Sequence, residues 1–174
     1  MSLPPSSRPP ASEYAPYYGQ YIARVPDGDI LATLESQGRE TARLLGGLDE
    51  AAGNHRYALG KWSLKEVVGH LNDTERVFTL RALAFSRNER AHLFGMEQDE
   101  WVAAAGFDRQ PLAALAAESV AIREATMRLF RSFDGEHWTR SGTASGVGFT
   151  VRAIPWIIAG HERHHLGVLR DRYL

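Results

Sequence analysis

The stretch SLKEVVGHLNDTERVFTLRALAFSR, residues 63–87, contains the clearest helix signal in this chain. Ser63 stands directly before the first apolar residue and Glu66 follows three positions later, which is the pattern of a capping box. Apolar side chains then recur at helical spacing, at Leu64, Val67, Val68, Leu71, Phe78, Ala82 and Phe85. This pattern predicts an amphipathic helix that buries one face and ends near Arg87.

Three further helices are predicted on either side of this one. Apolar residues at helical spacing place them at residues 29–48, 111–133 and 150–173. Pro111 suits the first turn of a helix, and Thr150 suits a cap. Four long helices around one core predict an all-α protein, a four-helix bundle.

The segments between these helices carry weaker signals. Residues 49–62 are polar and punctuated by glycine, so we expect a loop there. Residues 100–105 predict a short helix that ends at Gly106. Residues 134–149 contain four glycines and are expected to form a long flexible connection, with a short extended piece at residues 147–150.

The N-terminal residues 1–25 differ from the rest in composition. They hold five of the eight prolines and a group of tyrosines, Tyr14, Tyr17, Tyr18 and Tyr21. We interpret them as an extended Pro/Tyr-rich arm whose tyrosines lie on the domain surface or on a partner subunit; a loose tail is the alternative. Residues 26–174 then form the helical domain, which is long enough to bury a core.

The overall composition narrows the classes of function. Lys and Arg number 20 against 21 Asp and Glu, and a net charge of −1 favours neither nucleic acid nor anionic membrane as a partner. The chain has no cysteine, which excludes disulfides, a thiolate zinc site and a cysteine nucleophile. No apolar run is long enough to span a bilayer. We therefore expect a cytoplasmic protein that acts on a small-molecule substrate.

The run GHERHH, residues 160–165, carries the strongest chemical signal. His161 and His165 are four residues apart and project from the same helix face, about one turn apart. The isoleucines that precede them lie on that face too, so the pair is expected to be buried. A divalent metal would satisfy both imidazoles together. The alternative is a pair of core histidines bonded to carbonyl or carboxylate oxygens.

His70 is the candidate for a third ligand, because it lies at the edge of the apolar stripe of its helix. Together with His161 and His165 it would supply three neutral imidazoles and leave coordination positions open, as in catalytic metal sites. Asp73 and Glu162 are weaker candidates for a catalytic role. Either carboxylate would orient a histidine ring, and Glu162 is also a candidate proton acceptor.

The helices that carry these histidines contain two further patterns. HERHH, residues 161–165, also matches the H-E-x-x-H helix of zinc metalloproteases. Such enzymes usually take their third ligand from further downstream, where this chain offers few residues, so we do not expect a peptidase. Arg81, on the same side of its helix as His70, is a candidate to hold an anionic group, although a solvated surface arginine is the simpler interpretation.

Three segments together resemble a known family. They are KWSLKEVVGHLNDTER (residues 61–76), DEWVAAAGFD (99–108) and FTVRAIPWIIAGHERHHLGVLRDRY (149–173), which are similar to the DinB/YfiT-like superfamily in its DinB_2 branch. The resemblance implies a four-helix bundle with an up-down-down-up course, commonly a homodimer. It also implies a zinc or nickel ion bound by His70, His161 and His165.

The same resemblance implies two reactions. Some relatives are described as metal-dependent hydrolases, and others are thiol-dependent transferases or isomerases that use a low-molecular-weight thiol as cofactor. Our leading hypothesis is an enzyme whose three-histidine metal activates water or such a thiol against a small substrate. The alternative is a non-catalytic metal-binding or stress-response bundle, and a further one is an interaction scaffold that holds no metal.

Overall fold

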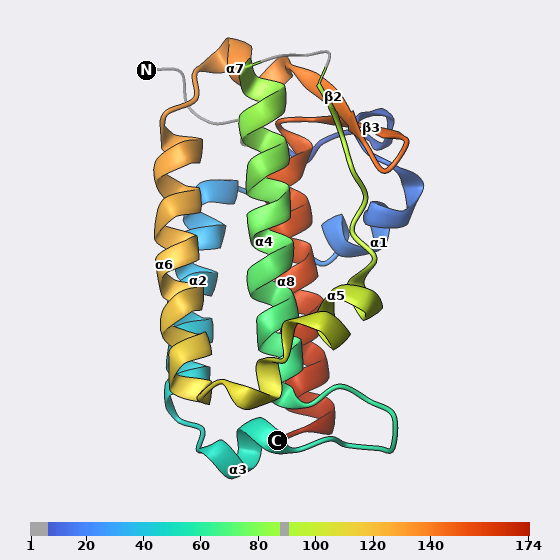
Figure 1. The fold of residues 1–174 in the computed structure, drawn as a ribbon. Helices are drawn as coiled ribbons and strands as arrows, with labels where there is room; N and C mark the ends of the chain where they lie inside the picture. Colours follow the sequence, from blue (N-terminus) through green and yellow to red (C-terminus); the bar gives the residue numbers. More distant parts are fainter. Residues whose placement is uncertain (1–6, 88–90) are drawn as a thin grey trace.

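The computed structural model describes residues 7–87 and 91–174, and four long helices dominate it (Figure 1). These helices are α2 (Ile30–Gly46), α4 (Leu64–Arg87), α6 (Leu112–Arg131) and α8 (Ala153–Arg172). Each lies inside its predicted range. The prediction of an all-α four-helix bundle is therefore confirmed.

The helices follow the up-down-down-up course. In Figure 1, α2 and α8 run down the bundle, and α4 and α6 run up it. Among the four long helices, the most extensive contacts join α4 to α6, α2 to α6, α4 to α8 and α2 to α8. It follows that α4 and α8, far apart in the sequence, lie side by side.

Of the two helices that carry the candidate ligands, α4 begins as predicted, and α8 begins at Ala153, two residues later than expected. At the start of α4, Ser63 Oγ accepts a hydrogen bond from Glu66 N at 3.1 Å, and Glu66 Oε2 accepts one from Ser63 N at 2.8 Å. At the start of α8, Thr150 Oγ1 accepts from Ala153 N at 3.2 Å. Pro155 is the third residue of α8, where its missing N–H costs no intrahelical bond. Local signals thus set the register of both helices.

Shorter elements surround the bundle. They are the 3₁₀ turns η1 (Ala11–Glu13), η2 (Pro16–Tyr18) and η3 (Phe107–Arg109), and the helices α1 (Gly19–Ile22), α3 (Glu50–Asn54), α5 (Gln98–Ala105) and α7 (Gly135–Thr139). Helix α5 matches the predicted short helix. Helix α3 was not predicted: it lies in the expected loop at residues 49–62 and is capped by Asp49, whose side chain accepts from Ala52 N at 2.8 Å.

The prediction of a flexible connection at residues 134–149 is wrong. After α7 the chain forms an antiparallel hairpin of β2 (Ser141–Ala144) and β3 (Val147–Thr150), and β1 (His92–Leu93) pairs in parallel with β2, in the order β1-β2-β3. Ser145 and Gly146 both have positive φ, 53° and 74°, as in a type I′ turn. At Gly142 a Cβ would overlap the ring of Phe85. These glycines therefore permit a tight turn and a close approach.

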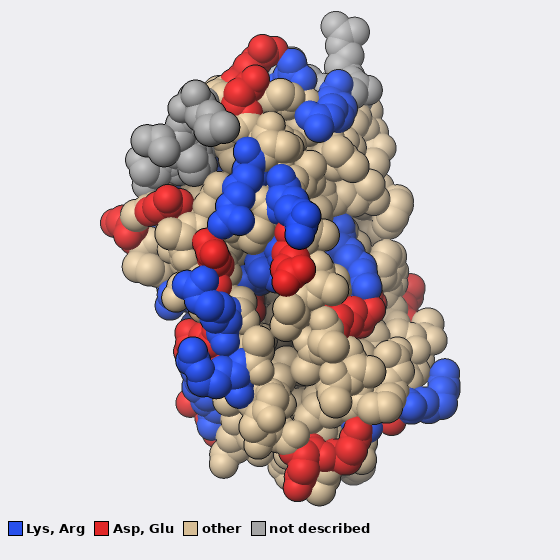
Figure 2. Space-filling view, turned by 90° about the vertical axis from the view of Figure 1, so that its left-hand side faces the viewer, with Lys and Arg blue, Asp and Glu red and all other residues tan. Residues whose placement is uncertain are grey.

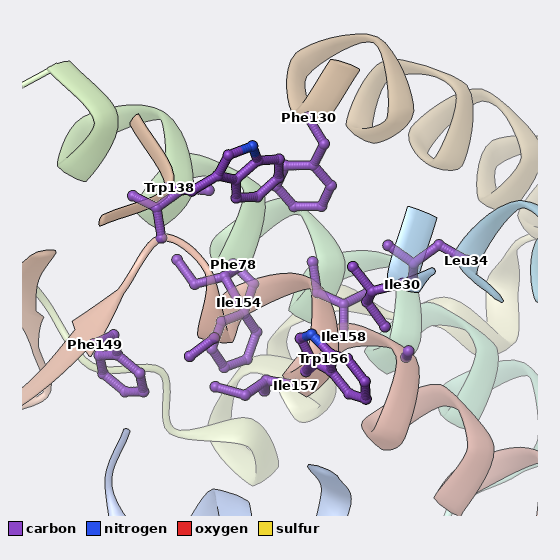
Figure 3. Close-up of a cluster of buried hydrophobic side chains, with 14 of the residues drawn as sticks. Ile30, Leu34, Phe78, Phe130, Trp138, Phe149, Ile154, Trp156, Ile157 and Ile158 are labelled. Carbon is purple, nitrogen blue, oxygen red and sulfur yellow. The ribbon is translucent and has the colours of Figure 1, made fainter. Parts of the chain in front are cut away.

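The bundle core has two apolar clusters, one toward each end. The larger cluster, drawn in Figure 3, includes Leu34, Phe78, Phe130, Trp156 and Ile158. The smaller cluster includes Leu45, Val68, Leu115 and Leu166. Between them each helix contributes buried polar side chains, which are Gln37 and Thr41 of α2, Glu75 of α4, Arg123 of α6 and Glu162 of α8. We call these five residues the polar layer.

Charge-assisted hydrogen bonds connect the polar layer. Arg123 Nε and Nη2 donate to the two carboxylate oxygens of Glu75, both at 2.8 Å, and Nη2 also donates to Glu162 Oε2 at 2.8 Å. Gln37 Nε2 and Thr41 Oγ1 donate to Glu162, each at 2.6 Å. Burial alone lowers the pKa of Arg123, but the charges of Glu162 and Glu75 outweigh it, so the pKa is raised. The guanidinium therefore stays charged.

The N-terminal segment packs against the bundle, although we expected an extended arm. Residues 1–6 lie outside the described residues, but from residue 11 the chain forms η1, η2 and α1, and α1 packs on α8. Arg8 donates to Ile22 O at 2.5 Å and to Val25 O at 2.6 Å. At Gly160 of α8 a Cβ would overlap the backbone of Tyr21. The segment is thus part of the domain's own packing.

Gly160→Ala tests this close approach. The added methyl group must push α1 away from α8, and we expect a loss of about 1–3 kcal/mol in the free energy of unfolding, measured by urea denaturation. Gly167→Ala is the matched control, because a Cβ at Gly167 of the same helix meets no atom within 4 Å. Equal stability of the two variants would show that α1 does not need the glycine.

The surface formed by α2 and α6 carries mixed charge. In Figure 2 acidic side chains lie among the basic ones on this face. For example, Glu35 Oε2 lies 2.8 Å from Arg131 Nη2, and Glu35 Oε1 lies 3.4 Å from Arg39 Nη1. Within the described part of the chain, no helix is long and apolar enough to cross a membrane.

Candidate metal centre

Three histidine side chains converge between α4 and α8. The Nε2 atoms of His70 and His161 are 3.1 Å apart, and those of His165 and His161 are also 3.1 Å apart. One nitrogen from each ring lies within 4.8 Å of the other two. His70 and His161 are buried, and His165 is partly buried. The structure therefore brings together the three residues that the sequence singled out.

The environment of these histidines favours their neutral form. Burial lowers the pKa of His70 to about 4, against a smaller opposing effect of Asp99. Burial and the neighbouring imidazoles lower the pKa of His165 to about 3, and they hold that of His161 well below its usual value. Near neutral pH each ring thus has a free lone pair, which is the form that binds metal.

The donor set fits a divalent metal ion. A single ring nitrogen carries either a proton or a lone pair, so Nε2 of His161 cannot form a full hydrogen bond to both neighbours. A metal–nitrogen distance of about 2.1 Å puts adjacent ligand nitrogens about 3.0 to 3.4 Å apart. The 3.1 Å separations agree with this spacing. Imidazole nitrogens suit zinc, nickel, copper or iron.

Aromatic and polar neighbours hold the rings in place. The Trp62 ring lies 5.0 Å from that of His70, and the Tyr21 ring lies 5.3 Å from that of His161. Thr74 Oγ1 is 3.5 Å from Nδ1 of His70. His164 contacts Tyr21 as well, at 5.6 Å between rings, and is not a member of the cluster of nitrogens. His164 thus differs from His161 and His165, although it lies in the same run.

Two of the three histidines border an open cavity of about 540 Å³. His70 and His161 line it from α4 and α8, and α1 and α5 lie on this same side of the bundle (Figure 1). Its other walls come from η2, α1, α4, the segment before α5, α5 itself and the hairpin turn, through Tyr17, Tyr18, Tyr21, Thr74, Phe78, Arg81, Met96, Asp99 and Ser145 among others. A small molecule can therefore reach the histidine cluster from solvent.

The two carboxylates suggested as catalytic lie elsewhere. Glu162 is bound in the polar layer. Asp73 lies 3.6 Å from Arg76, and burial raises the pKa of Asp73. Neither carboxylate belongs to the described residues that line the cavity. Their contacts do not lead to the histidine rings, and the polar atom beside His70 Nδ1 belongs to Thr74.

Three of the four tyrosines of the N-terminal segment, Tyr17, Tyr18 and Tyr21, are part of the cavity wall, a role that we did not predict from the sequence. Tyr14, Tyr17, Tyr18 and Tyr21 are spaced as residues i, i+3, i+4 and i+7. This spacing is typical of one helix face and was the available signal. The interpretation of Arg81 as a surface residue is also wrong, because its side chain is buried and lines the cavity.

A family model covers most of the chain. The model described as DinB_2, DinB superfamily, matches residues 33–169. The chain belongs to the DinB superfamily. The matched region of this DinB-superfamily chain includes all three histidines of the cluster. Among curated proteins, no significant match was found.

Two solved structures share the DinB fold. YfiT from Bacillus subtilis, described as a probable metal-dependent hydrolase with an unusual four-helix bundle topology, has 14% identity and a TM-score of 0.72, over 95% of this chain and 91% of that one. A mycothiol-dependent maleylpyruvate isomerase has 14% identity and a TM-score of 0.67, over 83% of this chain and 61% of the isomerase. At this identity the likeness shows the fold.

The lowered pKa values predict how pH affects the metal-free protein. The ordinary pKa of histidine is 6.5, so below that pH these histidines bind protons in the unfolded chain but stay neutral in the folded one. The free energy of unfolding therefore falls as the pH drops from about 6.5 toward 4. Between pH 7 and pH 4.5 we expect the Tm of chelator-treated protein to fall about 4 °C more than that of His70→Gln. Identical pH profiles would contradict the burial of a neutral His70.

Proposed function

We propose that this DinB-superfamily protein is a metal-dependent enzyme, with a divalent ion bound by His70, His161 and His165. The observation that carries the proposal is three neutral imidazoles converging on the wall of an open cavity. Three protein ligands leave at least one coordination position for another molecule, as catalytic metal sites require. When bound, the ion supplies Lewis acidity, which lowers the pKa of a bound water or thiol toward about 7.

The residues around the cluster would position the reactants. The histidines hold the ion at the cavity wall, and Thr74 lies beside Nδ1 of His70, where it can orient that ring. Trp62 packs against the ring of His70, and Tyr21 packs against that of His161. Substrate then enters from the cavity, between the tyrosines of the N-terminal segment and the residues around α5.

The descriptions of the two similar structures support two versions of this chemistry. One names a probable metal-dependent hydrolase, and the other a mycothiol-dependent isomerase. In the first version the activated nucleophile is water, and in the second it is a low-molecular-weight thiol, for which thiol-dependent transfer is the matching reaction. Both act on a small substrate and need the same open coordination position.

A thiol-dependence screen tests the proposal. Protein loaded with zinc or nickel is incubated with small electrophilic and ester substrates, with and without several low-molecular-weight thiols. Turnover without thiol identifies a hydrolase, and turnover only with thiol identifies a transferase. Both activities should be lost in His161→Ala. Stoichiometric metal with no turnover in any arm would favour the non-catalytic metal-binding bundle.

Two finer features belong to the same proposal. We propose zinc or nickel as the resident ion and a homodimer as the assembly, both of which the family resemblance implies. Metal analysis of protein purified without a histidine tag tests the first. Sedimentation equilibrium tests the second, and a monomer at micromolar concentration would contradict it.

A further inference from the structure

Arg81 has an unusual position for an arginine. It lies on α4, eleven residues after His70, and about three helical turns bring it back to the same side. The residue is only 3% exposed, yet Nη2 makes just two long hydrogen bonds, to Phe94 O and Ser145 Oγ, both at 3.4 Å. Within the described residues its Nε has no partner at all. A buried guanidinium normally has its donors satisfied.

The charge of Arg81 is also uncompensated by the residues that the structure describes. Its guanidinium lies over the rings of Phe78 and Phe149, at 4.9 Å and 5.8 Å from their centroids. Tyr18 is close by, but burial raises the pKa of Tyr18 despite the opposing effect of Arg81, so the phenol stays neutral. None of the ion pairs found in the described regions involves Arg81. A buried cation without a counter-ion is costly unless a ligand supplies one.

The cavity that Arg81 lines also has acidic residues in its wall. Glu97, Asp99 and Glu100 also line the cavity, but all three are exposed, so water screens their charges. Arg81 is buried, where its charge acts through a medium of lower dielectric. An anion that enters past the screened carboxylates therefore meets one strong attractive charge.

We propose that Arg81 binds an oxyanion, a carboxylate or a phosphate, on the small molecule that reaches the histidine cluster. This inference rests on the proposed function and names its substrate class. The Cα atoms of His70 and Arg81 are about 16 Å apart along the helix, and the arginine side chain spans part of that length. The ligand is thus an elongated small anion, with its charged group at Arg81 and its reactive group at the histidines. One edge of a guanidinium can bind two oxygens at once.

The test measures anion binding in chelator-treated, metal-free protein, so that a metal cannot bind the probe. Succinate, inorganic phosphate and uncharged succinamide are titrated by calorimetry into the native protein, Arg81→Met, Arg81→Lys and His161→Ala. Arg76→Met is the matched control, because Arg76 is an exposed residue of the same helix paired with Glu118 at 2.5 Å. All variants are first checked by circular dichroism and thermal unfolding.

We expect succinate or phosphate to bind the native protein, Arg76→Met and His161→Ala with similar affinity, and succinamide not to bind. Arg81→Met should weaken anion binding at least about tenfold. Arg81→Lys should weaken it less, because lysine keeps the positive charge but lacks the paired N–H donors of a guanidinium. Whichever of succinate and phosphate binds more tightly identifies the oxyanion as a carboxylate or a phosphate.

Equal anion affinity in native protein and Arg81→Met would overturn the inference, and so would loss of binding only in His161→Ala. If Arg81→Met does not fold, the native protein and Arg81→Lys decide, since no difference between them, or no binding by either, also overturns it. Failure of metal binding alone would leave the anion result intact. The two proposals therefore fail independently.

Discussion

His161→Ala is expected to abolish stoichiometric metal binding. His161 is the central member of the cluster, with its Nε2 at 3.1 Å from those of both His70 and His165. Without the His161 imidazole, only those of His70 and His165 remain as ligands, on either side of its former position. We expect metal affinity to fall at least about a hundredfold, beyond the usual effect of losing a residue that only supports a ligand. Elemental analysis of tag-free protein after dialysis measures the effect.

His164→Ala is the matched control for this substitution. His164 lies on the same helix and directly precedes His165, but its ring packs against Tyr21 and its nitrogens are outside the cluster. It should keep its full metal content. If the two variants retain metal equally, the three-histidine assignment is wrong. Thermal unfolding of both variants separates loss of metal from loss of fold.

Arg123→Met should produce the largest loss of stability in the chain. It would leave the carboxylates of Glu75 and Glu162 buried without the cation that binds both at 2.8 Å. Breaking such a buried pair costs about 3–5 kcal/mol. Urea unfolding at pH 8 measures the loss in the free energy of unfolding.

Arg131→Met is the control on the same helix. Arg131 pairs with Glu35 at a similar distance, 2.8 Å, but both side chains are about half exposed. An exposed pair contributes no more than about 1 kcal/mol. A similar loss of stability in the two variants would mean that the polar layer does not depend on its buried charges.

Much of the bundle follows from local residue patterns. The capping box at Ser63 and Glu66 and the cap at Thr150 involve neighbours only a few positions apart, and both are present in the structure. The spacing of His161 and His165 likewise predicts one shared face, because a helix repeats every 3.6 residues. These features need no knowledge of the rest of the chain.

The residues 134–149 and the N-terminal segment show the limit of local patterns. Four glycines in the first segment suggested flexibility, but Gly142 is required by the ring of Phe85, which is distant in sequence. The burial of Tyr21 likewise depends on a glycine at position 160 of α8. A contact with a distant residue leaves no periodic trace in either segment, so composition alone was misleading.

Taken by itself, the GHERHH run determined that two imidazoles share one helix face, and the 63–87 helix determined that His70 stands at the edge of an apolar stripe. Only the tertiary structure decided that these faces meet, because α4 and α8 are neighbours in the bundle although α6 lies between them in the sequence. The same packing directed Glu162 into the polar layer and Arg81 into the cavity. A helical repeat specifies the direction of a side chain relative to its own helix, but which groups lie opposite it depends on how the helices pack.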